Sequence, residues 1–212
     1  MKRPALLLLL LPLLASASER VPVGEFAAGR LDGWRPQTFR DKAETRYRLE
    51  EVDGRRALRA EANSSASGLI RELPVDLSRT PYLHWSWRIE RSLAGLDERR
   101  KGGDDFPVRV YVVAKGLLFW QTRSLLYVWS GSQPAGSQWA NPYTGNARMI
   151  ALRSGDGEAG RWLEERRDVR ADWRQAFGED ITRLDGVAIM TDGDDSRRHS
   201  LGWYGDIYFA SD

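Results

Sequence analysis

The sequence predicts an all-β protein, a single antiparallel β-sandwich of the jelly-roll type with one short helix near residues 171–177. Three observations support this prediction. Apolar and polar residues alternate with a period of two along most of the chain, Gly/Asp pairs separate the alternating runs, and helical spacing of apolar residues is rare. About ten short strands with little helix indicate two packed sheets, because each sheet must bury an apolar face.

The first alternating runs predict a hairpin. Residues 46–50 and 58–62 alternate between apolar and charged side chains, and Asp53-Gly54 lies between the two runs. A tight hairpin turn needs positive φ angles, which Asp-Gly adopts readily.

The middle and end of the chain contain the longer strand candidates. Trp85 and Trp87 alternate with polar residues over 83–89, and we interpret both as core residues. Arg109 faces away from the valines of the run 106–112. Residues 125–129 (LLYVW) are apolar on both sides, as in a strand that is covered on both faces. The remaining strand candidates are 147–152, 162–169, 186–192 and 203–209.

One segment has helical spacing. Trp173, Ala176 and Phe177 stand at i, i+3 and i+4, and Gly178 is suited to end the helix. The polar stretch 131–146 is predicted to be a long loop over one sheet, a place where function is often found. No linker, repeat or composition shift interrupts residues 18–212, so they are predicted to form one domain.

Residues 1–17 have the pattern of a secretory signal peptide. Lys2 and Arg3 precede an apolar run, ALLLLLLPLL, and Ala15-Ser16-Ala17 offers a cleavage site near Ala17/Ser18. A retained anchor is the alternative, although the run is short for a membrane span. We expect a periplasmic or secreted protein with no membrane span after cleavage.

Composition excludes several classes of function. Without residues 1–17 the chain carries 30 basic and 30 acidic groups, so no attraction to nucleic acid is expected. The chain has no cysteine and only two histidines. This excludes disulfides, thiolate nucleophiles and Cys-ligated zinc, and it leaves little room for sites that need several histidines.

The first candidate site is the acidic turn before the run 106–112. Asp104 and Asp105 follow two glycines, and Arg109 stands close behind them. The functional interpretation is a site for sugar hydroxyls or a cation, with Arg109 opposite a carboxylate. The structural alternative is a solvated turn with a buried ion pair between Arg109 and an aspartate.

A second acidic group follows the run 186–192. Asp192 and Asp194 at i and i+2 are candidate ligands of a structural calcium ion, because carboxylates so spaced can share one cation. Asp206 on the last strand is a further candidate for the ligand site. The alternative is an acidic turn neutralised by the arginines that follow it.

Tryptophan is abundant, and part of it lies in or beside the loop 131–146. Aromatic rings can stack on the apolar faces of sugars, and neighbouring amides can bind their hydroxyls. The candidate ligand-binding residues here are Trp129, Trp139, Asn141 and Tyr143. The alternative is that the tryptophans are large core residues.

The chain resembles an exported bacterial family known as domain of unknown function 3047. The matching blocks cover most of residues 25–210 and are 83–89 (LHWSWRI), 101–113 (KGGDDFPVRVYVV), 127–129 (YVW), 141–143 (NPY), 168–178 (DVRADWRQAFG), 189–192 (IMTD) and 204–207 (YGDI). The resemblance implies family membership and no activity. The N-terminal half is also similar to secreted carbohydrate-binding jelly rolls of the galactose-binding or lectin-like kind, through Phe26, Gly33-Trp34, Ser-Gly-Leu at 67–69 and the Trp-x-Trp strand.

Three functions follow as hypotheses. The first is a binding module for a glycan or a similar polyhydroxylated ligand, with no catalytic residues. The second is a carbohydrate-active hydrolase or lyase, which would pair Asp104 or Asp105 with Asp192 or Asp206. Its carboxyl groups would then stand ~5–5.5 Å apart for retaining chemistry or ~6.5–9.5 Å apart for inverting chemistry. The third is a cell-envelope scaffold that contacts another, unknown protein. No cofactor other than the candidate calcium ion is expected.

Overall fold

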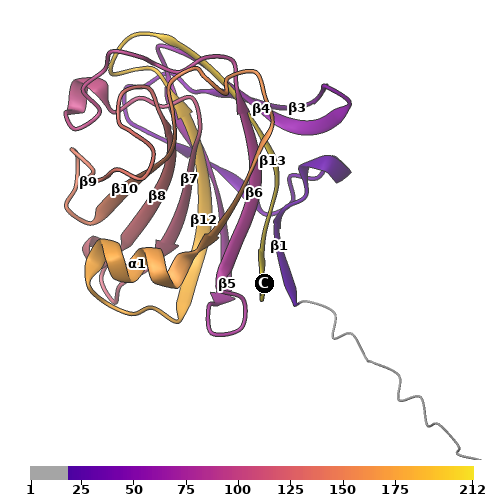
Figure 1. Ribbon diagram of the computed structural model, residues 1–212, viewed down its shortest axis with the longest axis vertical. Helices are drawn as coiled ribbons and strands as arrows, with labels where there is room; N and C mark the ends of the chain where they lie inside the picture. Colours follow the sequence, from indigo (N-terminus) through magenta and orange to yellow (C-terminus); the bar gives the residue numbers. More distant parts are fainter. Residues whose placement is uncertain (1–18) are drawn as a thin grey trace, which may run out of the picture.

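The computed structural model describes residues 19–212, so the predicted leader over 1–17 lies outside the described residues. The chain forms two β-sheets packed face to face, and the helix α1 (Val169–Phe177) lies at one end of them (Figure 1). The prediction of an all-β sandwich with one short helix is therefore confirmed. The helix begins two residues earlier than predicted, and three 3₁₀ turns complete the helical structure of the described residues: η1 (Phe26–Ala28), η2 (Lys101–Gly103) and η3 (Phe119–Gln121).

The first sheet has six strands and is antiparallel throughout. Its order is β11 (Leu163–Asp168), β6 (Tyr82–Ile89), β13 (His199–Ala210), β4 (Arg55–Asn63) and β3 (Arg46–Val52), with β1 (Arg20–Gly24) beside the end of β13.

The second sheet has seven strands. Its order is β2 (Trp34–Thr38), β5 (Ala66–Asp76), β12 (Arg183–Asp192), β7 (Arg109–Ala114), β8 (Arg123–Ser130), β10 (Ala147–Ser154) and β9 (Gln138–Ala140). All neighbouring strands within this sheet are antiparallel except β8 and β10, which run parallel to each other. A parallel pair cannot be joined by a tight hairpin, so the predicted loop 131–146 crosses to the sheet edge, forms β9 and returns.

Local sequence explains the turns and the helix ends. The β3–β4 hairpin turns at Asp53 and Gly54, whose φ angles of +51° and +72° match the predicted tight turn. Helix α1 begins where the Asp168 side chain accepts a hydrogen bond from the backbone N–H of Ala171 at 3.0 Å. It ends at Gly178, which adopts the left-handed conformation (φ +74°).

The main core lies between the two sheets. Trp85 and Trp87 of β6 project into it, as predicted, and Trp87 packs against Trp129 of β8 with ring centroids 6.3 Å apart. Helix α1 closes one end of this core through Trp173, and the buried Asp172 accepts a hydrogen bond from Tyr127 at 2.9 Å.

A smaller apolar cluster covers the opposite face of the seven-stranded sheet. It includes Phe106, Leu126, Val128, Trp139 and Met149. Because side chains alternate along a strand, β8 contributes Leu125 and Tyr127 to the main core and Leu126 and Val128 to this cluster. The run 125–129 is therefore apolar on both sides for the predicted reason.

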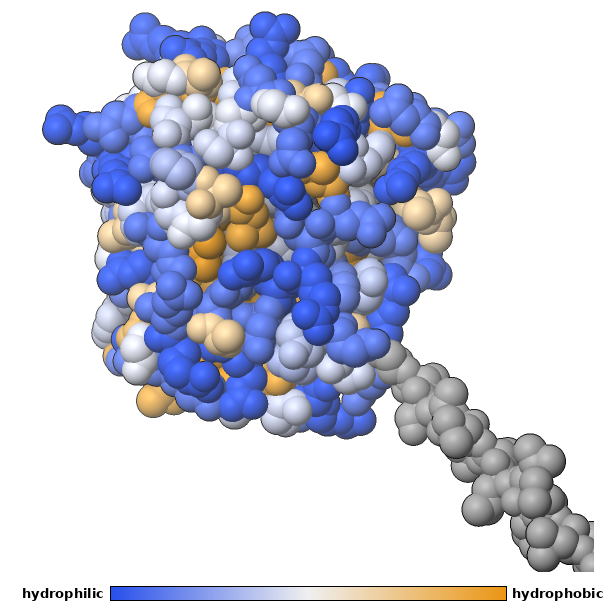
Figure 2. All heavy atoms as spheres, viewed as in Figure 1, coloured by the Kyte–Doolittle hydropathy of each residue, from blue (hydrophilic) through white to orange (hydrophobic). Residues whose placement is uncertain are grey.

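Most of the surface is polar. Figure 2 shows a face on which hydrophilic residues predominate and hydrophobic residues surface in small groups, the largest near the centre. None of the helices within residues 19–212 is long and apolar enough to cross a membrane.

Candidate functional site

A pocket of about 450 Å³ lies on the face of the seven-stranded sheet that is turned away from the main core. Its floor includes Tyr111 of β7, Leu126 of β8 and Met190 of β12. Each of these residues alternates with a core residue of the same strand, so the floor is a direct result of the period-two pattern. A polar loop or wall above an apolar floor is a common form of ligand site.

Loops between the strands form the walls of this pocket, and Asp104 of the β6–β7 loop lies in one of them. The β2–β3 loop contributes Phe39 and Lys42, the β9–β10 loop contributes Asn141 and Tyr143, and the β12–β13 loop contributes Asp195 among others. Phe39 and Tyr143 keep 43% and 52% of their surface exposed, so both rings are available to a ligand.

Arg109 forms a buried ionic centre at one end of the pocket. Its guanidinium pairs with the carboxylates of Asp192 and of Asp104, the latter at 3.4 Å, and stands 4.9 Å from the centroid of the Phe106 ring. The backbone N–H of Phe106 donates to Asp192 at 2.8 Å. The structural alternative, a buried pair of Arg109 with an aspartate, is thus present, and its residues also line the pocket.

Asp104 is incompletely satisfied. Its Oδ2 accepts hydrogen bonds from Arg109 and from the side chain of Asn141 at 3.1 Å, while its buried Oδ1 has no partner among residues 19–212. Burial raises the pKa of the Asp104 carboxyl above its usual value, and Arg109 opposes this effect. The hydrogen bond that Asp104 Oδ2 accepts holds the Asn141 side chain at the pocket wall.

Asp105 is fully buried and supports the acidic rim. Its carboxylate accepts hydrogen bonds from the backbone N–H groups of Asp195 at 3.3 Å and Ser196 at 2.6 Å. Through these contacts it holds the β12–β13 loop against the β6–β7 loop, where it cannot touch a ligand itself.

On the rim, Tyr143 donates its hydroxyl to the Asp195 carboxylate at 2.6 Å, and the Lys42 ammonium pairs with Asp194. Burial raises the pKa of Asp195, and the neighbouring carboxylates of Asp194 and Asp105 add to this effect. Burial and the hydrogen bond to Asp195 raise the pKa of the Tyr143 hydroxyl, so it remains a donor. The hydrogen bond to Asp194 raises the pKa of Lys42, which stays charged.

Three carboxylates could share a metal ion, namely those of Asp105, Asp194 and Asp195, each with an oxygen within 4.8 Å of the others. The predicted calcium ligands were Asp192 and Asp194. The structure groups Asp194 with Asp105 and Asp195 instead, while the Asp192 carboxylate pairs with Arg109. Calcium takes six to eight oxygen ligands. Here the Lys42 ammonium is the cation that faces Asp194 and Asp195.

Six of the ten predicted site residues line this one pocket: Asp104, Arg109, Asn141, Tyr143, Asp192 and Asp194. Asp105 lies directly behind the rim. The other three, Trp129, Trp139 and Asp206, lie outside this pocket. Trp129 is fully buried between the sheets and donates to the Gly155 carbonyl at 2.9 Å. Trp139 packs on Phe106 and donates to the Glu98 carbonyl at 3.1 Å, so its ring faces protein.

Asp206 lies on the other sheet, where it accepts a hydrogen bond from the backbone N–H of Ala27 at 2.8 Å. A carboxylate pair of Asp104 or Asp105 with Asp206 therefore does not form. Two pairs remain. Asp104 and Asp192 are both engaged by Arg109, and Asp105, the other possible partner of Asp192, accepts hydrogen bonds from the backbone of the β12–β13 loop.

Among the pocket residues that the sequence interpretation missed are Phe39, Lys42, Tyr111 and Met190. Tyr111 carried a usable signal, since it shares the face of Arg109 on an alternating strand. Phe39 carried a weaker one, as a lone aromatic in a polar stretch.

Comparisons with known proteins agree with the fold. A family model described as "Protein of unknown function (DUF3047)" matches residues 32–208. No curated protein gives a significant sequence match. Among solved structures, the family 30 carbohydrate-binding module of cellulosomal cellulase Cel9D-Cel44B of Clostridium thermocellum is similar with a TM-score of 0.51 and 12% identity, over 92% of this chain and 98% of that chain. The family 11 carbohydrate-binding module of Lic26A-Cel5E from the same organism gives 0.49 and 9%, over 92% and 95%.

Proposed function

The chain belongs to the DUF3047 family of proteins of unknown function, and from that premise we propose that it is a glycan-binding protein whose site is the pocket on the seven-stranded sheet. Family membership brings no activity with it. The proposal therefore depends on the chemistry of the pocket.

One observation carries the proposal: two exposed aromatic rings and a set of polar groups surround the same apolar floor. Phe39 and Tyr143 offer ring faces for the apolar side of a sugar, while Asn141, Asp195 and Lys42 offer partners for its hydroxyls. Sugars need both kinds of contact, because each ring has apolar faces and a polar edge. A volume of about 450 Å³ lies within the range typical of small-ligand sites.

Two further points support the proposal. The similar fold with a TM-score of 0.51 is named as a carbohydrate-binding module, although fold alone does not specify function. The predicted leader at residues 1–17 would bring the protein to the periplasm or the medium, where polysaccharides are accessible.

Isothermal titration of the purified protein with soluble cell-wall, storage and exopolysaccharide oligomers tests the proposal. We expect binding to at least one oligomer, and we expect Phe39→Ala and Tyr143→Ala each to weaken it about three- to tenfold through lost ring contact. Tyr208→Ala is the matched control, because this tyrosine lies on the outer face of the other sheet. Absence of binding across the panel, or equal loss in the Tyr208 variant, would overturn the assignment to this pocket.

A further inference from the structure

The walls of the pocket on the seven-stranded sheet carry more acidic than basic groups. Four carboxylates and two cationic groups line it: Asp104, Asp192, Asp194, Asp195, Arg109 and Lys42. Asp105 lies directly behind the rim, and the Lys101 ammonium stands 5.1 Å from the centroid of the Tyr143 ring. With these two included, five carboxylates stand against three cations, so this set of groups has an excess of two negative charges.

Most of this excess gathers at the rim. Asp105, Asp194 and Asp195 each have an oxygen within 4.8 Å of the other two. The ammonium of Lys42 pairs with Asp194 and stands 3.9 Å from Asp195. Burial and the negative charges of Asp194 and Asp105 nevertheless raise the pKa of the Asp195 carboxyl. Lys42 therefore compensates these carboxylates incompletely, and a further cation would stabilise them.

Asp104 supplies a second, independent observation. It lines the pocket, only 4% of its surface is exposed, and its buried Oδ1 has no hydrogen-bond partner within the described part of the chain. Buried acceptors are rarely left unpaired. The charge of Asp195 also raises the pKa of Asp104, so the two carboxylates are close enough to repel each other. Both carboxylates of the pocket wall thus lack positive charge or a hydrogen-bond donor.

A protonated amine fits these groups better than a metal ion does. Calcium takes six to eight oxygen ligands, whereas both oxygens of Asp105 already accept backbone N–H groups. An ammonium group has three N–H donors, and each needs a single acceptor. The ring of Tyr143 is 52% exposed and is hydrogen-bonded to Asp195 through its hydroxyl, so a cation at Asp195 would lie beside an aromatic surface.

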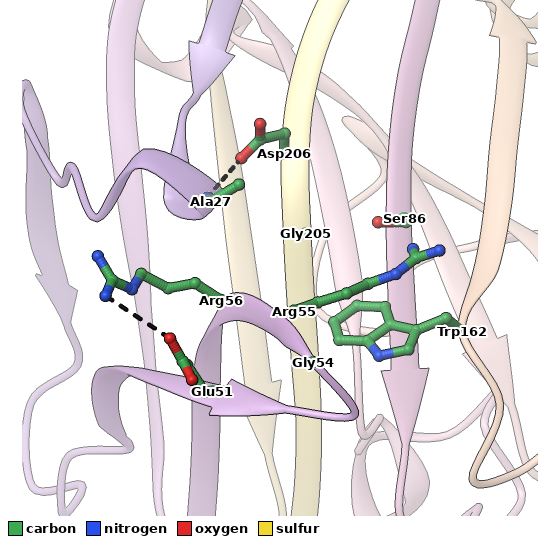
Figure 3. Close-up of a pocket in the computed structure, with 9 residues that line it drawn as sticks. All are labelled: Ala27, Glu51, Gly54, Arg55, Arg56, Ser86, Trp162, Gly205 and Asp206. Carbon is green, nitrogen blue, oxygen red and sulfur yellow. Dashed lines mark hydrogen bonds and ion pairs between the residues drawn. The ribbon is translucent and has the colours of Figure 1, made fainter.

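The other large hollow of the molecule shows no such convergence of charge. It has a volume of about 660 Å³ and lies on the outer face of the six-stranded sheet. Figure 3 shows that Arg56 turns toward Glu51 on one side, whereas Arg55 extends toward Trp162 on the other. Its charged groups therefore do not define one ligand group, as those of the pocket on the seven-stranded sheet do.

We propose that the pocket on the seven-stranded sheet selects glycans that carry free, protonated amino groups, such as oligomers of glucosamine. The inference rests on the proposed function and specifies its class of ligand. The ammonium binds at Asp195, and the sugar ring that carries it lies on the apolar floor near Phe39. A neutral glycan leaves the excess carboxylates uncompensated, and an acidic glycan is repelled by them.

Isothermal titration at neutral pH, with a chelator present to remove metal ions, tests this proposal. The ligands are three β-1,4-linked trimers that differ only in the group at C2: glucosamine, N-acetylglucosamine and glucose. Because a charge-assisted hydrogen bond forms only with the free amine, the glucosamine trimer should bind at least about tenfold more tightly than either neutral trimer.

Two variants should change this preference in opposite directions. Asp195→Asn removes a negative charge and keeps an acceptor for the Tyr143 hydroxyl, so the preference for the glucosamine trimer over the glucose trimer should fall about threefold or more. Lys42→Gln removes the cation that competes for Asp194, so the preference should rise by a similar factor.

Glu164→Gln is the matched control, because it makes the same change in net charge at an 81% exposed side chain of the other sheet. It should leave the preference unchanged. The inference is wrong if a neutral trimer binds as tightly as the glucosamine trimer, or if Asp195→Asn alters the preference no more than Glu164→Gln does. In either case the pocket still binds a glycan and the proposed function stands. If no trimer binds, the inference fails, and the wider panel of oligomers decides the proposed function separately.

Discussion

The guanidinium of Arg109 on β7 pairs with the carboxylate of Asp192 at the end of β12, and each side chain keeps only 3% of its surface exposed. Asp104 stands on the other side of the same guanidinium at 3.4 Å. Burying charged groups is costly unless they are paired, so each of these residues depends on the others. The centre joins two neighbouring strands to the β6–β7 loop at the end of the pocket on the seven-stranded sheet.

Arg109→Met should lower the free energy of unfolding by about 3–5 kcal/mol, because two buried carboxylates lose their cation. Adding Asp104→Asn and Asp192→Asn should recover part of this loss, since neutral amides tolerate burial better and can still accept hydrogen bonds. Urea denaturation at neutral pH measures both effects. A triple variant less stable than Arg109→Met alone would contradict the interpretation that charge pairing with Arg109 stabilises the two buried carboxylates.

Asp105 is expected to act through the loop that it holds. Asp105→Ala leaves the backbone N–H groups of Asp195 and Ser196 without an acceptor, so stability should fall by about 2 kcal/mol. Amide hydrogen exchange at residues 193–197 should accelerate, and Asp105→Asn, which keeps one acceptor oxygen, should show a smaller change. Unaltered exchange in the alanine variant would contradict the positioning role.

Glu61 predicts a dependence of stability on pH. The hydrogen bond from Arg59 at 2.8 Å, together with that from His199, lowers the pKa of Glu61 to about 2 from a usual value of 4.5. A carboxyl group with a lowered pKa stabilises the folded state above pH 4.5, and this contribution is lost as the pH falls toward 2.

Glu61→Gln should therefore be less stable than the unchanged protein at pH 7, by less than about 1 kcal/mol because solvent reaches and screens the pair, the Glu61 side chain being 27% exposed. The difference should shrink progressively between pH 4.5 and pH 2. Denaturation curves at pH 7, 4 and 2.5 measure it. A constant difference over this range would show that the charge of Glu61 is not the cause.

Gly205 of β13 lies so close to Ser86 of β6 that a side chain at position 205 would clash with the serine hydroxyl. Gly205→Ala should destabilise the protein by about 1–3 kcal/mol, since the new Cβ would overlap the Ser86 oxygen. The double variant Gly205→Ala/Ser86→Ala should regain most of this loss, because the next nearest contact is at 3.4 Å. Thermal unfolding of both single variants and the double variant completes the cycle. Additive effects would exclude a direct clash.

Much of the fold follows from local pattern. The alternating runs predict nine of the strands, and the Asp53-Gly54 turn and the helix end at Gly178 follow from residues that tolerate positive φ. The edge strand β2 was missed, because it contains Pro36 and is mostly exposed, so it has no clear alternation. The parallel pairing of β8 with β10 was also missed, since register between distant segments is set by the assembled sheet.

The site was predictable only in part, for a related reason. Arg109 and Asp192 are far apart in sequence, and they meet because β7 and β12 are neighbours in the sheet. The residue pattern of each strand predicts the strand but not which strand lies beside it. Trp129 and Trp139 were misjudged because a position near a polar loop says little about which side of a sheet the ring takes. Asp206 was grouped with the other aspartates by residue type, whereas its strand belongs to the other sheet.

The parallel arrangement of β8 and β10 has a consequence for how this family can diversify. The return segment after β9 carries Asn141 and Tyr143, yet it contributes little to the ladder of hydrogen bonds that holds the sheet together. Insertions, deletions or substitutions there would reshape one wall of the cavity while leaving the scaffold intact. Changes in this short connection should therefore alter the shape of the pocket at little cost to the free energy of unfolding.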